Sequence, residues 1–210
     1  KKIENTPTGT CLILITPDSE RTMCTFLGIA GKITPGDIDE SFIKQSELVF
    51  LEGYLWDEGE PKAAFDKALA LANKSAMSLS DKFCVDRHKK SFYDLVKNEL
   101  DIIFANEQEI MELIDAKSFD DVIEFGKDLS KKLVVTRSDK GSIAISGSEV
   151  VECESQKNLK IIDLTGAGDL FAAGFLHGYI NTMSAKESLQ KGTELASKII
   201  QKIGARLNHQ

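Results

Sequence analysis

Short apolar segments alternate with helical segments between residues 48 and 138, and this alternation most constrains the fold. The apolar segments are nearly continuous in hydrophobic residues, as strands buried on both faces of a parallel sheet are. Helices between them would cover those two faces. We therefore expect an α/β fold with a doubly wound, mostly parallel sheet. The expected strands are 48–53, 76–81, 101–106 and 133–138, and the expected helices are 60–74, 90–99, 107–114 and 120–132.

Two hairpins are expected on either side of this region. The β-prone runs 10–16 and 21–28 flank the turn signal at Pro17 and Asp18. The runs 142–146 and 149–153 flank a two-residue turn that contains Gly147. Two helices are expected after the second hairpin, at the end of the chain.

The composition limits the classes of partner. With 42% hydrophobic and 28% charged residues and no long uninterrupted apolar run, the sequence predicts a globular protein without a membrane span. A formal net charge of -7 disfavours nucleic acids and anionic membranes as partners. Small molecules are therefore the expected partners. The four cysteines, Cys11, Cys24, Cys84 and Cys153, lack metal-binding spacing and are expected to be reduced thiols in a cytoplasmic protein.

The stretch DLTGAGD, residues 163–169, joins an expected strand end at 160–163 to an expected helix. Gly166 and Gly168 expose the backbone, so the N–H groups from Gly166 through Asp169 could converge on a phosphate at the helix start. Asp169 adds a negative charge to the same place, and a general base would explain it. The alternative is a glycine turn in which Asp169 is an ordinary first-turn helix residue.

Asn106 and Glu109 lie three residues apart at a strand-to-helix junction. This spacing places two oxygen-bearing side chains on one face of a first helical turn, which suits Mg²⁺ or its waters. The alternative is a capping box, in which the two residues satisfy each other's backbone N–H groups.

The stretch VVTRSDKG ends an expected strand with a turn that closes at Gly141. Thr136 and Arg137 suit nucleotide contacts, although a routine β-turn reads the same way. The chain has no GxxxxGK[ST] motif, which excludes a Walker-type phosphate loop.

Together these motifs resemble those of the ribokinase-like, or PfkB, carbohydrate and nucleoside kinases. DLTGAGD resembles the signature DTxGAGD of the family, which implies that Asp169 is the catalytic base and that Gly166, Ala167 and Gly168 form an anion hole. FANEQE resembles the NxxE motif, which implies that Asn106 and Glu109 organise Mg²⁺, largely through water, next to the nucleotide.

The resemblance also implies a nucleotide site. VTRSDKG resembles the VTxGxxG segment, so that Thr136, Arg137, Ser138 and Gly141 would contact ATP, with Ser138 in place of the usual glycine. The pattern in ELASKIIQKIGAR resembles the last helix of the family beside the adenine pocket and makes Thr193 a nucleotide neighbour.

The resemblance further implies a ribokinase-like core at 31–210 and a small β lid at 1–30. Complete family members carry roughly a further hundred residues before this hairpin on the usual domain scale, so this chain alone is expected to expose the hairpin and to turn over little ATP. A homodimer through the lid and activation by a monovalent cation are further expectations.

The expected reaction is transfer of the γ-phosphoryl group of MgATP to a primary hydroxyl. The runs TPDSERTM, LEGYLWD and LSDKFCVDRH resemble bacterial adenosine kinase-type members, which favours the 5'-hydroxyl of adenosine as acceptor. The alternatives are a free sugar, such as ribose or fructose, and a catalytically silent nucleotide-binding protein.

Overall fold

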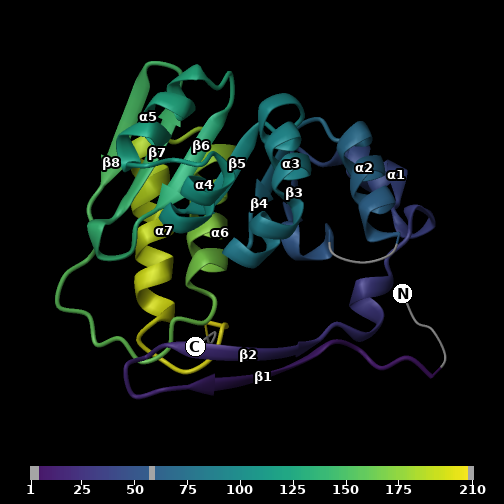
Figure 1. Cartoon of the computed structure of the whole chain (residues 1–210), viewed down its shortest axis with the longest axis horizontal. Helices are drawn as coiled ribbons and strands as arrows, with labels where there is room; N and C mark the ends of the chain where they lie inside the picture. Colours follow the sequence, from purple (N-terminus) through teal and green to yellow (C-terminus); the bar gives the residue numbers. More distant parts are fainter. Residues whose placement is uncertain (1–4, 57–59, 208–210) are drawn as a thin grey trace. The chain divides into compact units, whose positions relative to one another are not determined.

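A six-stranded sheet with the strand order β3-β4-β5-β6-β7-β8 is the centre of the fold. The computed structural model describes residues 5–56 and 60–207. Residues 1–4 of the expected lid and residues 57–59 and 208–210 of the expected core lie outside the described residues. The strands are β3 (Val49–Glu52), β4 (Ser75–Ser78), β5 (Ile102–Asn106), β6 (Lys132–Thr136), β7 (Ser142–Ser146) and β8 (Glu149–Cys153) (Figure 1). The expected α/β architecture is confirmed.

The chain divides into two compact units, which we describe separately. The first unit contains residues 1–10, 25–135 and 145–149. The second unit contains residues 11–24, 136–144 and 150–210. The expected division at residue 30 stays a prediction.

Parallel pairing of β3, β4 and β5 organises the first unit. Val49 pairs with Ser75, and Ala76 pairs with Ile102. The strands are short and apolar because both faces are covered: Met77 and Ile103 have no exposed surface. The helices of this unit are α1 (Glu40–Gln45), α2 (Pro61–Leu71), α3 (Lys82–Asn98), α4 (Glu107–Leu113) and α5 (Phe119–Asp128).

Two expectations for these helices were incomplete. The expected start of α3 at residue 90 was wrong, because the helix begins at Lys82, where the Asp81 carboxylate accepts a hydrogen bond of 2.7 Å from the backbone N–H of Cys84. The helical backbone is interrupted at His88, with φ -117° and ψ 19°, and the expected helix at 90–99 corresponds to the part after this interruption. The short α1, capped by Asp39, was not expected.

The second unit is dominated by two helices, α6 (Ala167–Ile180) and α7 (Ala185–Ile199), which lie side by side (Figure 1). Glycines permit their close approach. A Cβ atom on Gly174 would lie 2.6 Å from the carbonyl oxygen of Lys191, and one on Gly178 would lie 2.6 Å from the hydroxyl oxygen of Ser188. The close approach of the two helices therefore requires glycine at residues 174 and 178.

Strands β1 (Thr10–Ile15) and β2 (Arg21–Phe26) form the expected amino-terminal hairpin as a separate two-stranded sheet. Its apolar side chains are largely exposed, with 63% of Leu12 and 53% of Leu14 accessible. The hairpin is confirmed, and its role as a lid stays a prediction.

The expected strand end at 160–163 was wrong. This segment belongs to no strand, and the backbone N–H groups of Ile162 and Asp163 both donate to the carbonyl oxygen of Ile200, at 2.8 and 3.3 Å. The apolar residues at 161–162 therefore predict a strand that does not form. No helix among residues 5–56 and 60–207 is long and apolar enough to cross a membrane.

We predict that Gly174→Ala lowers the free energy of unfolding by about 1–3 kcal/mol, as overpacking of a tight contact does. The added methyl group would meet the Lys191 carbonyl, and the two helices would have to separate. Urea unfolding measures the change. The matched control is Gly168→Ala in the same helix, where a Cβ atom would meet nothing within 4 Å. Equal stability of the Gly174→Ala variant and the wild type would contradict the packing argument.

Candidate functional site

The DLTGAGD turn leads directly into α6, and Gly166 is the N-cap of this helix. Gly166 has φ 80° and ψ 4°, a left-handed conformation that glycine adopts without strain. A Cβ atom at this position would also lie 3.0 Å from the Cβ of Ala205. Backbone conformation and packing therefore both require glycine at residue 166.

The first turn of α6 exposes backbone N–H groups. The N–H groups of Gly168 and Asp169 have no acceptor within the helix, because the residues four positions before them lie outside it. The N–H of Ala167 donates to the carbonyl oxygen of Leu164 at 3.2 Å. A Cβ atom on Gly168 would face open space, so an anion can approach the backbone here.

Asp169 is exposed in this same first turn. The positive end of the helix dipole favours its negative charge. This position suits a base beside an anion site, and it equally suits an ordinary first-turn acid. The assignments of Asp169 as base and of Gly166, Ala167 and Gly168 as anion hole stay predictions.

Asp163 is a buried acid that the sequence did not single out. Only 2% of its surface is exposed. One carboxylate oxygen, Oδ1, accepts hydrogen bonds from the backbone N–H of Thr165 at 2.8 Å and from its hydroxyl at 2.6 Å. The other oxygen, Oδ2, accepts one from the N–H of Gly204 at 2.9 Å. Burial works to raise the pKa of Asp163, but these donors and the nearby charge of Arg21 hold that pKa below its ordinary value.

Asn106 and Glu109 form the capping box that was the alternative reading. Asn106 ends β5 and is the N-cap of α4, and its side-chain oxygen accepts a hydrogen bond of 2.8 Å from the N–H of Glu109. The Glu109 carboxylate in turn accepts from the N–H of Asn106 at 2.9 Å and from its side-chain amide at 2.6 Å. The box does not exclude a second role, and the metal role stays a prediction.

The environment of Glu109 fits a nearby cation. Only 5% of its surface is exposed, and burial raises the pKa of Glu109 to about 7, against the hydrogen bond from the Asn106 backbone and with a further increase from Asp81. In the part of the chain that the structure describes, no cluster of three or more His, Cys, Asp or Glu residues could hold a metal ion. Asn106 and Glu109 present oxygen atoms, the ligand type that Mg²⁺ prefers, and the metal role of this pair stays a prediction.

The 136–141 turn follows β6. The N–H of Arg137 donates to the carbonyl oxygen of Gly141 at 2.8 Å, which closes the turn. Ser138 has φ 54°, a left-handed conformation that glycine adopts more readily than serine, which is consistent with glycine being the residue expected here from the resemblance. Gly141 has φ 94°, and a Cβ atom on it would lie 2.1 Å from the carbonyl oxygen of Cys153.

Thr193 lies on α7 and meets the same part of the second unit. Its hydroxyl donates to the sulfur of Cys153 at 3.7 Å, so Cys153 contacts both Thr193 and the backbone at Gly141. Thr136, Arg137, Ser138, Gly141, Thr193 and the DLTGAGD turn all belong to the second unit, and Asn106 and Glu109 belong to the first. Nucleotide contacts from any of these residues stay predictions.

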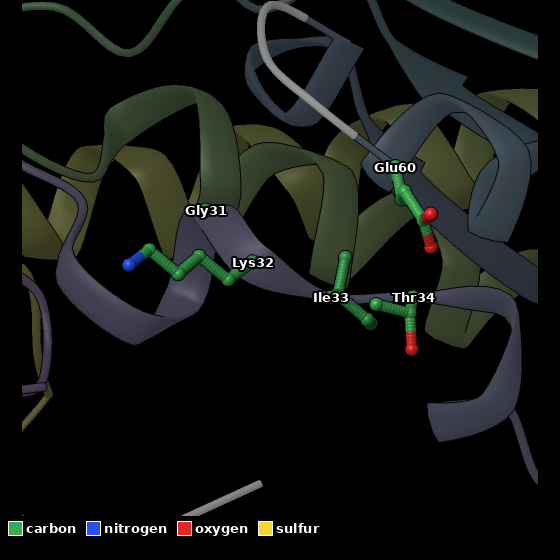
Figure 2. A pocket seen from close by; sticks show the side chains of 5 residues that line it. All are labelled: Gly31, Lys32, Ile33, Thr34 and Glu60. Carbon is green, nitrogen blue, oxygen red and sulfur yellow. The ribbon is translucent and has the colours of Figure 1, made fainter. Parts of the chain in front are cut away.

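A shallow hollow of about 170 Å³ in the first unit contains none of the predicted site residues. Gly31, Lys32, Ile33, Thr34 and Glu60 line it (Figure 2). The side chains of Lys32 and Glu60 point apart in Figure 2, so its charged groups do not converge on a common point.

We predict that the metal-free protein loses stability as the pH rises from about 4.5 to 7. Glu109 has an ordinary pKa of 4.5 and a folded-state pKa of about 7, so the folded state binds the additional proton between these values. The free energy of unfolding should fall by up to about 1.4 kcal/mol per pH unit across this window. Urea unfolding in EDTA at several pH values measures the slope.

Glu109→Gln should flatten this slope, whereas Glu187→Gln should leave it unchanged. Glu187 is the control because it is also a capping-box acid, at the start of α7, but it is exposed and its pKa is lowered. The same slope in wild type and Glu109→Gln would refute the burial argument.

Comparison with known proteins gives one family. The family described as "pfkB family carbohydrate kinase" matches residues 1–210. Among solved structures, the adenosine kinase of Sinorhizobium meliloti is 36% identical with a TM-score of 0.94, over 99% of this chain and 65% of that one. The "probable sugar kinase protein" of Rhizobium etli CFN 42 is 34% identical with a TM-score of 0.94, over 98% of this chain and 64% of that one.

A curated relative has a sugar-derived substrate in its name. The 5-dehydro-2-deoxygluconokinase of Geobacillus kaustophilus is 27% identical over 181 residues, which are 80% of this chain and 54% of that protein. This chain therefore spans just under two thirds of the two solved structures, 65% and 64%, and 54% of this curated relative. The match along the whole chain confirms the resemblance carried by the three motifs: the chain belongs to the pfkB family of carbohydrate kinases and has a ribokinase-like fold.

Proposed function

We propose that this chain is the nucleotide-binding part of a kinase that phosphorylates a primary hydroxyl of a ribose-containing small molecule. The acceptor is the 5'-hydroxyl of adenosine and the donor is MgATP. The observation that carries the proposal is the start of α6, where Gly166 turns the backbone, Gly168 leaves its surface open and Asp169 stands exposed in the same turn.

Asp169 acts as the proton acceptor in this proposal. As the acceptor oxygen bonds to the γ-phosphorus, the bond from phosphorus to the β–γ bridging oxygen breaks, and the hydroxyl proton passes to the Asp169 carboxylate. The N–H groups of Gly168 and Asp169 stabilise the charge on the oxygens of the transferring group. The dipole of α6 adds to this stabilisation at its amino end.

The other predicted residues bind the donor. Thr136, Arg137, Ser138 and Gly141 contact the nucleotide, and Thr193 lies beside its base. Asn106 and Glu109 would hold Mg²⁺ through water, and a bound ion would neutralise phosphate charge. A solved structure described as "a putative Ribokinase II in complex with ATP and Mg+2 from E.coli", 19% identical to this chain, has the same fold.

The β1–β2 hairpin serves as the lid of the acceptor site in this proposal. Its exposed Leu12, Leu14 and Met23 would be covered on closure, by other parts of the protein or by a second subunit. Closure would exclude water that otherwise hydrolyses ATP. A cytoplasmic location and activation by a monovalent cation belong to the same proposal.

The choice of acceptor is supported by the likeness to the adenosine kinase of Sinorhizobium meliloti. The almost equal likeness to the "probable sugar kinase protein" favours a free sugar as the second candidate. A protein that binds ATP without catalysis is the candidate from another class, and the exposed carboxylate of Asp169 weighs against it.

Acceptor-stimulated ADP release from the full-length protein tests the proposal. Adenosine, ribose and fructose are supplied separately with MgATP, against a control without acceptor. Stimulation by adenosine supports the proposal, and stimulation by a sugar alone would replace the acceptor. ATP binding without stimulation by any acceptor would favour the silent nucleotide-binding protein.

We predict that Asp169→Asn lowers kcat by about 10² to 10⁴, because the amide cannot accept the hydroxyl proton. ATP binding should be largely kept, since the backbone N–H groups remain. Asp120→Asn is the matched control, because Asp120 is also an exposed acid in the first turn of a helix, α5. Wild-type turnover by the Asp169→Asn variant would remove Asp169 from the mechanism.

We predict that Gly168→Ala separates activity from stability. The added methyl group meets no atom of the chain within 4 Å, and alanine is favoured over glycine in a helix, so stability should be kept or raised. The methyl group would intrude on an anion at the backbone, so kcat should fall roughly tenfold or more. Paired unfolding and kinetic measurements test this. Unchanged kinetics would show that no phosphate lies against Gly168.

A further inference from the structure

The Asp163 carboxylate joins two segments that are far apart in the sequence. Its Oδ1 atom holds Thr165, inside the DLTGAGD turn, through the backbone N–H and the hydroxyl. Its Oδ2 atom holds the N–H of Gly204, beyond the end of α7, at 2.9 Å. Both oxygens therefore have donors, and each group of donors comes from a different segment.

The segment after α7 supports the turn at further points. The carbonyl oxygen of Ile200 accepts from the N–H groups of Ile162 and Asp163. Ala205 lies directly against Gly166, at the left-handed position from which α6 starts. Gly204 has φ 90°, so this segment too has a backbone conformation that only glycine adopts readily. The backbone of the turn thus rests on residues 200–205.

The amino-terminal hairpin reaches the same junction. The hydroxyl of Ser19, in the turn between β1 and β2, donates to the carbonyl oxygen of Ile161 at 3.0 Å. The charge of Arg21, on β2, acts on the Asp163 carboxylate. Three segments of the second unit therefore meet around a residue that is itself buried.

The position of Gly166 sets where the N–H groups of Gly168 and Asp169 point, because the first helical bond of α6 runs from the N–H of Leu170 to the carbonyl oxygen of Gly166 at 2.9 Å. A shift of the turn against residues 200–205 would therefore move the whole first turn of α6. Small displacements of a group that stabilises a transition state have large kinetic effects.

We propose that Asp163 is a positioning residue, whose carboxylate fixes the anion-binding turn by fastening it to the segment after α7. Asp163 acts through the backbone of Gly166, Gly168 and Asp169 and touches neither substrate. This inference rests on the proposed kinase function for its kinetic consequence, while its structural consequence is independent of that function.

Asp163→Asn tests the link to Gly204. The amide keeps one oxygen for Thr165 and places an N–H₂ group, which is a donor, against the N–H of Gly204. Hydrogen–deuterium exchange should therefore accelerate in residues 164–170 and in residues 200–206 together. In the full-length enzyme, kcat should fall roughly 10²-fold, while the KM for ATP should change less than about threefold.

Two further variants make the test specific. Thr165→Val removes only the hydroxyl donor to Oδ1 and should accelerate exchange in 164–170 with a smaller loss of kcat. Glu187→Ala removes a comparable capping interaction at the other end of α7, where Glu187 accepts hydrogen bonds from Ser184, and should leave both segments and kcat unchanged.

Acceleration in both segments with a fall in kcat at nearly constant KM supports the proposal. Acceleration confined to 164–170 in Asp163→Asn would refute the link to the segment after α7, and an unchanged kcat beside accelerated exchange would refute the positioning role.

If Asp163→Asn unfolds, accelerated exchange of 164–170 and lowered kcat in Thr165→Val support the proposal, and their absence refutes it. A wild-type protein without acceptor-stimulated ADP release would refute the kinase function instead, and the exchange result would still decide the link.

Discussion

Every helix start leaves backbone N–H groups without an acceptor inside the helix, and the rest of the site depends on how this chain satisfies them. In α1, α3, α4 and α7 a side chain at the N-cap accepts one or more of these hydrogen bonds, from Asp39, Asp81, Asn106 and Ser184. At α6 the N-cap is Gly166, which has no side chain to offer. The N–H groups of this first turn are therefore left for solvent or for a ligand.

The starts of α4 and α6 differ in how their backbone N–H groups are satisfied: α4 has a side-chain cap and α6 has none. At α4, Asn106 and Glu109 satisfy each other, and the carboxylate of Glu109 is buried with a raised pKa. Such a carboxylate loses solvation without gaining a positive partner among its hydrogen-bond donors, so a divalent ion held nearby through water would stabilise its charge. The capping box therefore fixes the orientation of Glu109, and the two readings of this motif are compatible.

Residues with strong local signals were predictable from the sequence. The alternation of apolar strands and helices gave the sheet, and the two-residue turn at Gly147 gave the β7–β8 hairpin. The spacing of Asn106 and Glu109 indicated the capping box that they form, although only as the alternative to a metal site. In each of these cases the interaction that forms the structure lies within a few residues along the chain.

Features that depend on distant partners were not predictable in the same way. The segment 160–163 has the apolar residues of a strand, but its N–H groups bond to Ile200, which only the folded helix pair brings near. The role of Asp163 was missed for the same reason, because the Gly204 donor lies 41 residues further along the chain. The sequence shows Asp163 as an acid at the end of an apolar segment, and this pattern does not indicate which distant residue it contacts.

Asp163 and Asp169 show how one short motif separates two uses of the same side chain. Asp163 is buried, and its two oxygens accept three hydrogen bonds from Thr165 and Gly204, which keep it ionised and fixed. Asp169 is exposed at the start of α6, where its carboxylate can meet a ligand. The three hydrogen bonds favour the ionised form of Asp163 and make it a weaker proton acceptor, whereas the side chain of Asp169 is open to solvent. The five residues between them, 164–168, thus separate a buried carboxylate that joins two segments from the exposed carboxylate that we propose as the proton acceptor.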